Sequence, residues 1–302
     1  MKADRCETYA AKAEEADSVR EVTEGFRPRL RIMHPQPASA NRNPGPAARA
    51  AAFRSSFARR QAAAVTEAVG GFVVADPALP RSNEHNQLVL DGTAAPEAVL
   101  AALEGPLGHR QVSVLTGELG DLCTPLLTAA GYTRDDELVL VHTGPLPPLG
   151  ERTPDGAAAG GVRSVEPEEL RAAVKREQRR WNPDGDAELL RQLAGRGGTR
   201  RRGAPEVLFL ASRAADGEPA AWADLYLDPA AGIAQIEGVV TAERYSRRGH
   251  ADAVLADGLR RAAAAGCGLF FLVADANDWP RHWYARRGFT EVGRSHRFYR
   301  PR

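Results

Sequence analysis

The chain has 302 residues, of which 43% are hydrophobic, so it can form one large or two ordinary domains, each with its own core. Its formal net charge of +1 argues against a general nucleic-acid-binding surface. No apolar run reaches the ~18 residues of a membrane span or resembles a secretory signal, and three widely spaced cysteines fit neither a disulfide framework nor a zinc site. We therefore expect a cytoplasmic protein without a metal, a membrane or a nucleic-acid partner.

The first part of the chain predicts an extension followed by an α/β domain. Residues 1–45 are mixed in charge and end in a Pro-, Asn- and Gly-rich stretch, which is typical of poorly ordered chain. The Ala-rich run 46–69 predicts a helix. Periodicity and turn residues then predict strands and helices in the order β-β-α-β-α-β, at 71–76, 86–91, 96–103, 111–116, 118–130 and 138–142. The Pro- and Gly-rich residues 144–161 predict a linker.

The second part, residues 162–302, predicts a mixed α/β domain. We expect a strand at 162–165, helices at 167–181 and 186–193, and a loop at 196–203 that carries Arg200, Arg201 and Arg202. The remaining elements are expected as three strands, a helix, a strand, a helix and a closing strand, at 206–212, 219–227, 232–241, 250–265, 269–275, 278–287 and 289–293.

An Arg- and Gly-rich turn joins the third of these strands to the helix that begins near His250. The first amides of a helix have no internal partner, and the helix dipole makes this end partly positive. Gly249 would let an anion approach the backbone closely, and Arg247 and Arg248 add positive charge. The turn therefore predicts an anion site, the alternative being an ordinary surface turn.

The residues of this turn, Ser246-Arg247-Arg248-Gly249-His250-Ala251, resemble the GNAT superfamily signature Gln/Arg-x-x-Gly-x-Gly/Ala. Ser246 departs from the signature, since Gln or Arg is usual there. The resemblance implies a GNAT fold, which is an α/β mixed sheet, and acetyl-CoA as co-substrate. It further implies that the amides of Arg247, Arg248, Gly249, His250 and Ala251 hold the CoA pyrophosphate.

A second segment, from Val273 to Phe289, resembles the other hallmark of the superfamily, with Asn277, Tyr284 and Gly288 at matching positions. The resemblance implies that Asn277 contacts CoA and that Tyr284 is the general acid that protonates the departing thiolate. Asn277 or Asp278 can also cap the following helix. The alternative for Tyr284 is a packing role alone.

The strand at 232–241 matches the superfamily strand that splays from its neighbour and holds the thioester. The resemblance implies that the amides of Val239 and Val240 bind the pantetheine arm. Gly238 inside a strand indicates a bulge or a close backbone approach. Glu237 lies where several members have a general base, and its apolar neighbours can raise its pKa by desolvation. The alternative is a Glu on the solvated face of the strand.

The two parts of the chain resemble distant repeats, as in tandem GNAT proteins with one degenerate half. Residues 124–132 parallel 282–289, each with a helix, a Gly, an aromatic residue and a strand. Leu127 stands where Tyr284 stands, and residues 91–96 replace the Arg/Gly turn without any positive charge. We therefore expect residues 46–143 to form a degenerate domain without CoA, with residues 83–86 either lining an acceptor cleft or lying in a solvated loop.

These inferences predict acetyl transfer from acetyl-CoA to a primary amine on a small-molecule or peptide acceptor, by a monomer or a homodimer. Two alternatives remain open. One is a GNAT-fold transferase with another acyl donor, such as a longer acyl-CoA or an aminoacyl-tRNA. The other is a non-catalytic acyl-CoA-binding or scaffold protein, which Ser246 and the degenerate half keep open.

Overall fold

A computed structural model describes residues 44–104, 111–148 and 157–300. Almost all of the predicted extension at 1–45 and the middle of the predicted linker at 144–161 lie outside these ranges. Within them, no helix combines the length and the apolar character that crossing a membrane requires.

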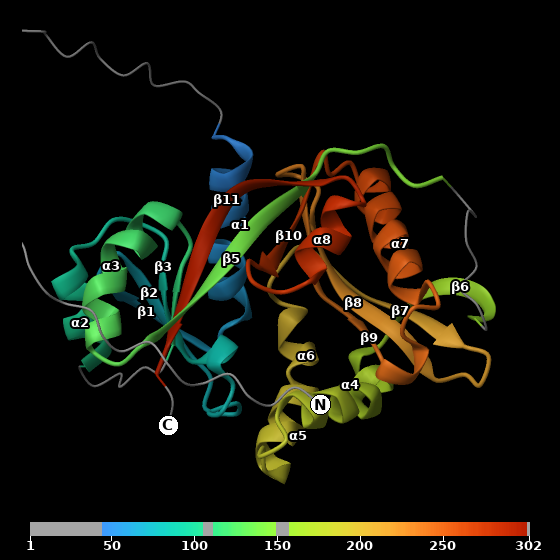
Figure 1. The fold of residues 1–302 in the computed structure, drawn as a ribbon, viewed down its shortest axis with the longest axis horizontal. Coiled ribbons are helices and arrows are strands. Elements are labelled where there is room, and N and C mark those ends of the chain that lie inside the picture. Colours follow the sequence, from blue (N-terminus) through green and yellow to red (C-terminus); the bar gives the residue numbers. More distant parts are fainter. Residues whose placement is uncertain (1–43, 105–110, 149–156, 301–302) are drawn as a thin grey trace, which may run out of the picture. The chain divides into compact units, whose positions relative to one another are not determined.

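The described chain is organised around one mixed sheet of eleven strands, in the order β1-β2-β3-β4-β11-β5-β10-β9-β8-β7-β6 (Figure 1). Most neighbours are antiparallel, but β3 and β4 are parallel, and so are β9 and β10. The strands are β1 (Ala64–Ala68), β2 (Gly71–Ala75), β3 (Gln87–Leu90), β4 (Gln111–Val114), β5 (Thr133–His142), β6 (Ala157–Val165), β7 (Glu206–Ala214), β8 (Pro219–Asp228), β9 (Ile233–Thr241), β10 (Leu269–Asp275) and β11 (Phe289–Tyr299). The observed fold class is thus the expected α/β mixed sheet.

The α-helices cover both faces of this sheet. They are α1 (Pro46–Gln61), α2 (Pro96–Glu104), α3 (Gly117–Ala129), α4 (Pro167–Trp181), α5 (Ala187–Gly195), the one-turn α6 (Gly197–Arg200), α7 (His250–Ala264) and α8 (Pro280–Ala285). Side chains alternate along each strand, so one strand contributes to two cores. In β10, Phe271 faces the core that contains α1, whereas Phe270 and Leu272 face the core that contains α7.

Helix α1 packs against strands from both parts of the chain. Phe53 and Phe57 lie in one core with Phe271 of β10 and Tyr226 of β8, and the Phe57 and Tyr226 rings stack at 4.2 Å between centroids. Ala51 and Ala58 of the same helix pack against the core of β2 and β3. α1 belongs to the first part of the chain, so one face of the strands β8 and β10 of the second part is covered by a helix of the first part.

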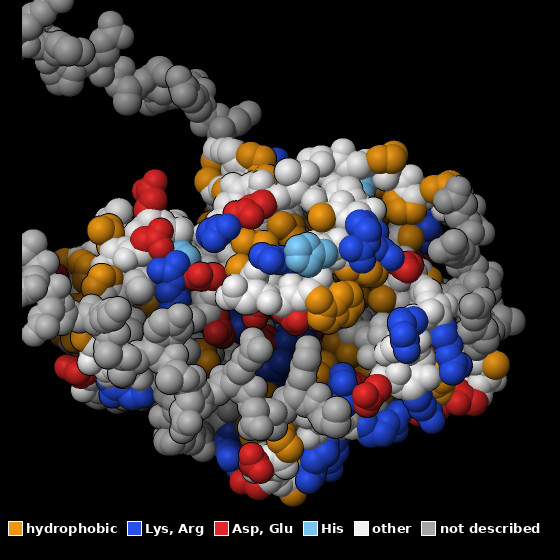
Figure 2. Space-filling view, in the orientation of Figure 1, with side chains coloured by type: hydrophobic (Ala, Val, Ile, Leu, Met, Phe, Trp, Pro, Cys, Tyr) orange, Lys and Arg blue, Asp and Glu red, His pale blue; other side chains and the backbone are white. Residues whose placement is uncertain are grey.

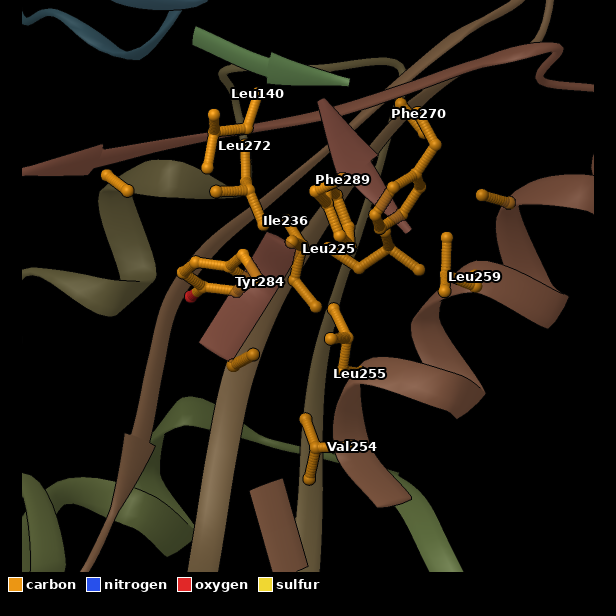
Figure 3. Packing of buried hydrophobic residues seen from close by; sticks show 14 of the residues in the cluster. Leu140, Leu225, Ile236, Val254, Leu255, Leu259, Phe270, Leu272, Tyr284 and Phe289 are labelled. Carbon is orange, nitrogen blue, oxygen red and sulfur yellow. The ribbon is translucent and has the colours of Figure 1, made fainter. Parts of the chain in front are cut away.

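The opposite face is covered by α7 beside β7, β8 and β9, and this core includes Tyr284 of α8 (Figure 3). Val254, Leu255 and Leu259 of α7 recur at helical spacing and are almost fully buried. A separate core joins α2 and α3 to β3 and β4.

Strands β5 and β11 exchange places between the two parts of the chain. β5 pairs with β10 from Phe271↔Val141 to Asp275↔Glu137, and β11 pairs with β4 from His296↔Val114 to Tyr299↔Gln111. The two strands also pair with each other and lie side by side in the middle of the sheet (Figure 1). The strand expected to close the second part is therefore separated from β10 by β5. Residues 46–143 and 162–302 as separate domains stay a prediction.

Two local expectations are wrong. The helix expected at 46–69 ends at Gln61, and the chain turns into β1, where Val65 and Thr66 are β-branched and pair with β2. The loop expected at 196–203 contains α6. β1 forms a local hairpin with β2, which the high alanine content of this run obscured, and α6 is a single turn within a Gly- and Arg-rich run that is typical of a loop.

Candidate active site

The turn before α7 has a backbone shaped to receive an anion. Arg247 and Gly249 have φ of 63° and 86°, and Arg247 is the one non-glycine residue in the described ranges with a positive φ. Residues of opposite backbone handedness in succession turn their N–H groups toward a common point. No hydrogen bond among the described residues uses the amides from Arg247 to Asp252. These free donors lie at the N-terminus of α7, where the helix dipole favours negative charge.

Side chains around the turn hold it in place and add positive charge. His250 is 1% exposed, and its Nδ1 lies 2.8 Å from the Ser212 hydroxyl of β7, which fixes the start of the helix against the sheet. Burial lowers the pKa of His250, so the neutral ring is favoured. Arg247 and Arg248 are exposed and form no salt bridge in the described part of the chain. Basic side chains also gather at the lower right of Figure 2, over α4 and the lower end of α7 as Figure 1 labels them.

Strands β9 and β10 separate next to this turn. They pair only over Leu269↔Ile233 to Phe271↔Gln235, although β9 continues to Thr241 and β10 to Asp275. On its other side, β9 has a bulge against β8 between the pairs Trp222↔Val240 and Asp224↔Glu237. Gly238 lies in this bulge with φ of 61°, a conformation that favours glycine. The predicted splay and the predicted bulge are both present in the segment that contains Val239 and Val240.

Glu237 lies at the edge of the opening. Its carboxylate accepts a hydrogen bond from Gln235 Nε2 at 2.8 Å, and it lines two cavities, of about 590 Å³ and about 140 Å³. Burial raises the pKa of Glu237, Arg200 acts in the opposite direction, and Glu84 raises it further. A half-buried carboxyl group with a raised pKa has the property that a general base needs.

Tyr284 lies on α8, on the α7 side of the sheet (Figure 3). The side chain is 8% exposed, and its ring packs edge-on against Trp283 at 4.8 Å and Phe289 at 5.6 Å. Its hydroxyl has no hydrogen-bond partner among the described residues. Burial and, to a lesser extent, the charge of Glu237 raise the pKa of Tyr284 well above its usual value. The group is therefore a protonated donor with no competing acceptor.

The start of α8 differs from expectation. The helix begins at Pro280 rather than at 278, and neither Asn277 nor Asp278 caps it, since the N-cap position is Trp279 without a side-chain cap. Asn277 is exposed at the end of β10, and its amide donates to Asp275 Oδ1 at 2.7 Å. Its side chain is accessible, and its predicted contact with CoA stays a prediction.

A charged cluster that the sequence did not reveal lies beside Glu237. Arg200 donates to Glu84 Oε2 at 2.7 Å and to Asp224 Oδ2 at 2.6 Å, and Tyr226 also donates to Asp224. Neighbouring His85 is 1% exposed, and its two ring nitrogens contact Ser82 and Thr199. Asn83 and Glu84 thus line the cavity, with Asn83 exposed and His85 buried behind them, and the Arg200 guanidinium pairs with two carboxylates.

The partners of Arg200 are 116 and 24 residues away in sequence, so no local motif predicts this cluster. The run Arg200-Arg201-Arg202 is more typical of a solvated surface. The signal that could have indicated this cluster was Asp224, in the middle of the apolar strand β8. A buried carboxylate needs a cation or several hydrogen-bond donors beside it, so an arginine partner could have been expected.

Comparisons with known proteins agree with this geometry. Residues 168–289 match the model of the acetyltransferase (GNAT) family. Among solved structures, a GCN5-related N-acetyltransferase from Kribbella flavida is similar with a TM-score of 0.57 and 20% identity, over 85% of this chain and 96% of that one. A functionally unknown conserved protein from Staphylococcus epidermidis has a TM-score of 0.58 and 14% identity, over 77% and 91%. No curated protein matches the chain significantly.

At these identities the structural neighbours show the fold alone. The assignment of residues 168–289 to a family rests on the match to the family model. Its matched range contains the free amides before α7, the separation of β9 from β10, and Tyr284. The chain therefore carries, over residues 168–289, a domain of the GNAT acetyltransferase family.

Proposed function

We propose that the protein is an N-acetyltransferase that moves an acetyl group from acetyl-CoA to a primary amine. The observation that carries this proposal is the free amides from Arg247 to Asp252 next to the separated strands β9 and β10. A pyrophosphate fits the first feature, because it offers anionic oxygens to unpaired N–H groups. An extended pantetheine arm fits the second, because β9 has unpaired backbone along that edge.

The proposed mechanism is direct transfer in a ternary complex. Glu237 takes the proton of the bound ammonium group, and the free amine attacks the thioester carbonyl. The amides of Val239 and Val240 stabilise the negative charge that develops on the carbonyl oxygen. The C–S bond breaks, and Tyr284 donates its hydroxyl proton to the departing sulfur, which leaves as CoA thiol. The product nitrogen loses its surplus proton, which restores the Tyr284 hydroxyl and leaves a neutral amide.

We further propose that residues 46–143 do not bind CoA. In α3, Leu127 is fully buried in the core of α2 and α3, at the position that parallels Tyr284. β3 and β4 pair up to Leu90↔Val114, the ends of both strands, so no separation like that of β9 and β10 opens between them. One acetyl-CoA per chain is therefore expected.

Calorimetric titration with acetyl-CoA tests the proposal. Wild-type protein should bind one molecule per chain, and Gly249→Val should abolish binding, because a β-branched side chain at φ of 86° distorts the turn. Gly266→Val is the matched control, since Gly266 has φ of 79° at the other end of α7. Both variants carry backbone strain of about 1–3 kcal/mol, but only Gly249→Val should lose acetyl-CoA.

Other outcomes have defined meanings. Two sites per chain would overturn the assignment of residues 46–143. No binding by wild-type protein would favour another acyl donor, and tight binding without turnover across a broad amine panel would favour a non-catalytic role.

A further inference from the structure

The 590 Å³ cavity beside Glu237 is lined by both parts of the chain. Arg54, Gln61 and Arg81 come from the first part, and Arg196 and Arg200 from the second. The volume lies in the range of small-molecule sites, about 300–1,000 Å³. Because Glu237 lies in its wall, an amine seated in the cavity would face the proposed general base.

Most of the arginines in this wall are already balanced by carboxylates. Arg54 donates to Glu137 at 2.9 Å and to Ser295 at 2.7 Å. Arg297 forms ion pairs with Asp135 and Glu137, and Arg200 with Glu84 and Asp224. These guanidinium groups hold the wall together and have little capacity left for a ligand.

Arg81 and Arg196 differ because each keeps unused donors. Arg81 pairs through Nη1 with Asp186, but its Nε is buried without a partner. Arg196 has one ion pair within the described ranges, to Glu84 at 3.2 Å, and Arg200 contacts the same Glu84 oxygen at 2.7 Å. Burial lowers the pKa of Arg196, Glu84 acts in the opposite direction, and the charge of Arg200 lowers the pKa further.

Gln61 adds an unused acceptor to the same cavity. The residue is 4% exposed, and its Oε1 has no hydrogen-bond partner. A buried polar atom without a partner costs about 1–3 kcal/mol, and unpaired atoms of this kind are rare in folded proteins. Three residues of the cavity wall carry such an atom: Arg81 Nε, Gln61 Oε1 and Arg297 Nε. Arg297 Nε still has the Glu137 carboxylate at 3.2 Å, whereas the atoms of Arg81 and Gln61 indicate that a polar ligand supplies the missing contacts.

We propose that the acceptor is a small amine that also bears an anionic group, held with its ammonium at Glu237 and its anion at Arg81 and Arg196. This inference rests on the proposed acetyl transfer. Carboxylate and phosphate share the required chemistry, since each accepts several N–H bonds from guanidinium groups. The wall thus complements a molecule with opposite charges at its two ends.

Acetyl transfer to matched pairs of amines tests the inference. The probes are free amino acids against their carboxamides, and amino sugars against their phosphates. The anionic member should have a kcat/KM at least about tenfold higher, which is the usual effect of a charge-assisted contact. A preference in the first pair alone identifies a carboxylate, and in the second pair alone a phosphate.

Variants assign the preference to the two arginines. Arg81→Gln and Arg196→Gln should each raise KM for the anionic member and bring the ratio within the pair toward one, and Arg81→Lys should restore part of it. Arg171→Gln is the matched control, because Arg171 is 57% exposed on α4 outside the cavity. Each variant is also titrated with acetyl-CoA, so that a failure of the proposed function, seen as lost acetyl-CoA binding, is distinguished from a failure of this inference.

Equal kcat/KM within every pair would overturn the inference. An equal loss for both members in the arginine variants would also do so, because it would indicate a structural role. If acetyl-CoA binds but no anionic amine is acetylated or binds to the CoA-saturated protein, the inference is again wrong.

Discussion

At the residue scale, the environment of Tyr284 suits a proton donor. Desolvation favours the neutral phenol over the phenolate, and the nearby Glu237 has the same effect. The ring is held by Trp283 and Phe289, so its position does not depend on a hydrogen bond from the hydroxyl. A thiolate leaving group would therefore meet a positioned donor with no other acceptor to satisfy.

Tyr284→Phe should lower kcat by about 10²-fold or more, since a positioned general acid contributes roughly 10²–10⁴-fold. The ring contacts persist, so the acetyl-CoA Kd and the melting temperature should change little. Steady-state kinetics and calorimetry check both expectations. Tyr132→Phe, in the separate core of α2 and α3, is the control. Full turnover in the Tyr284 variant would show that the tyrosine only packs.

Glu237 predicts a pH profile. Its pKa is raised, so the base is protonated over a range in which an ordinary glutamate is already ionised. The acid limb of kcat/KM should therefore rise at a higher pH than an ordinary carboxyl would give, and Glu237→Gln should remove this limb and lower kcat. A profile unchanged in Glu237→Gln would assign the base to another group.

The raised pKa of Glu237 also predicts how stability depends on pH. As pH rises, ionisation of Glu237 should increase kcat/KM but lower the free energy of unfolding. The folded state binds the Glu237 proton more tightly than the unfolded state, so stability falls as pH rises through the window between the two pKa values. Above that window, Glu237→Gln should melt at a higher temperature than the wild-type protein.

At the element scale, local patterns predicted those segments whose structure depends on local chemistry. The ranges of α4 and β10 agree with expectation, since α4 has Pro167 in its first turn and a reciprocal Glu166–Glu169 cap. α7 follows its apolar stripe and the Gly249 turn. At the α1–β1 boundary, the β-branched Val65 and Thr66 were a local strand signal that the alanine content outweighed. The exchange of β5 with β11 depends on partners distant in sequence, and the single-sequence pattern contains no signal for it.

The one-turn helix α6 should depend on Arg200 for its position. Arg200→Met leaves Glu84 and Asp224 without their shared cation, and breaking a buried pair on one side costs about 3–5 kcal/mol. Denaturant unfolding should show a loss of that order. Arg171→Met, at an exposed helix pair, should cost less than about 1 kcal/mol. A small loss in the Arg200 variant would mean that water replaces the cation.

At the scale of the whole molecule, the two parts of the chain share their sheet, one helix and the proposed acceptor cavity. β10 gains an antiparallel partner only through β5, and β11 is paired on both sides by strands of the first part. Phe57 of α1 lies against Gly203, where a Cβ would come within 2.3 Å of its ring, so the contact between the parts leaves no room for a side chain. Such close packing agrees with the single compact unit that the described residues form.

Splitting the chain within 149–156 should therefore yield fragments that do not fold alone. The fragment that begins at 157 would expose an edge of β10 and leave β11 unpaired, and unpaired strand edges favour aggregation. Co-expressed fragments should associate, melt as one unit and bind one acetyl-CoA. The control is an intact chain with a protease site inserted in 149–156, cleaved after folding, which should retain binding. If the C-terminal fragment alone melts cooperatively and binds acetyl-CoA, the exchanged strands are dispensable, and residues 162–302 are an independent domain as the sequence predicted.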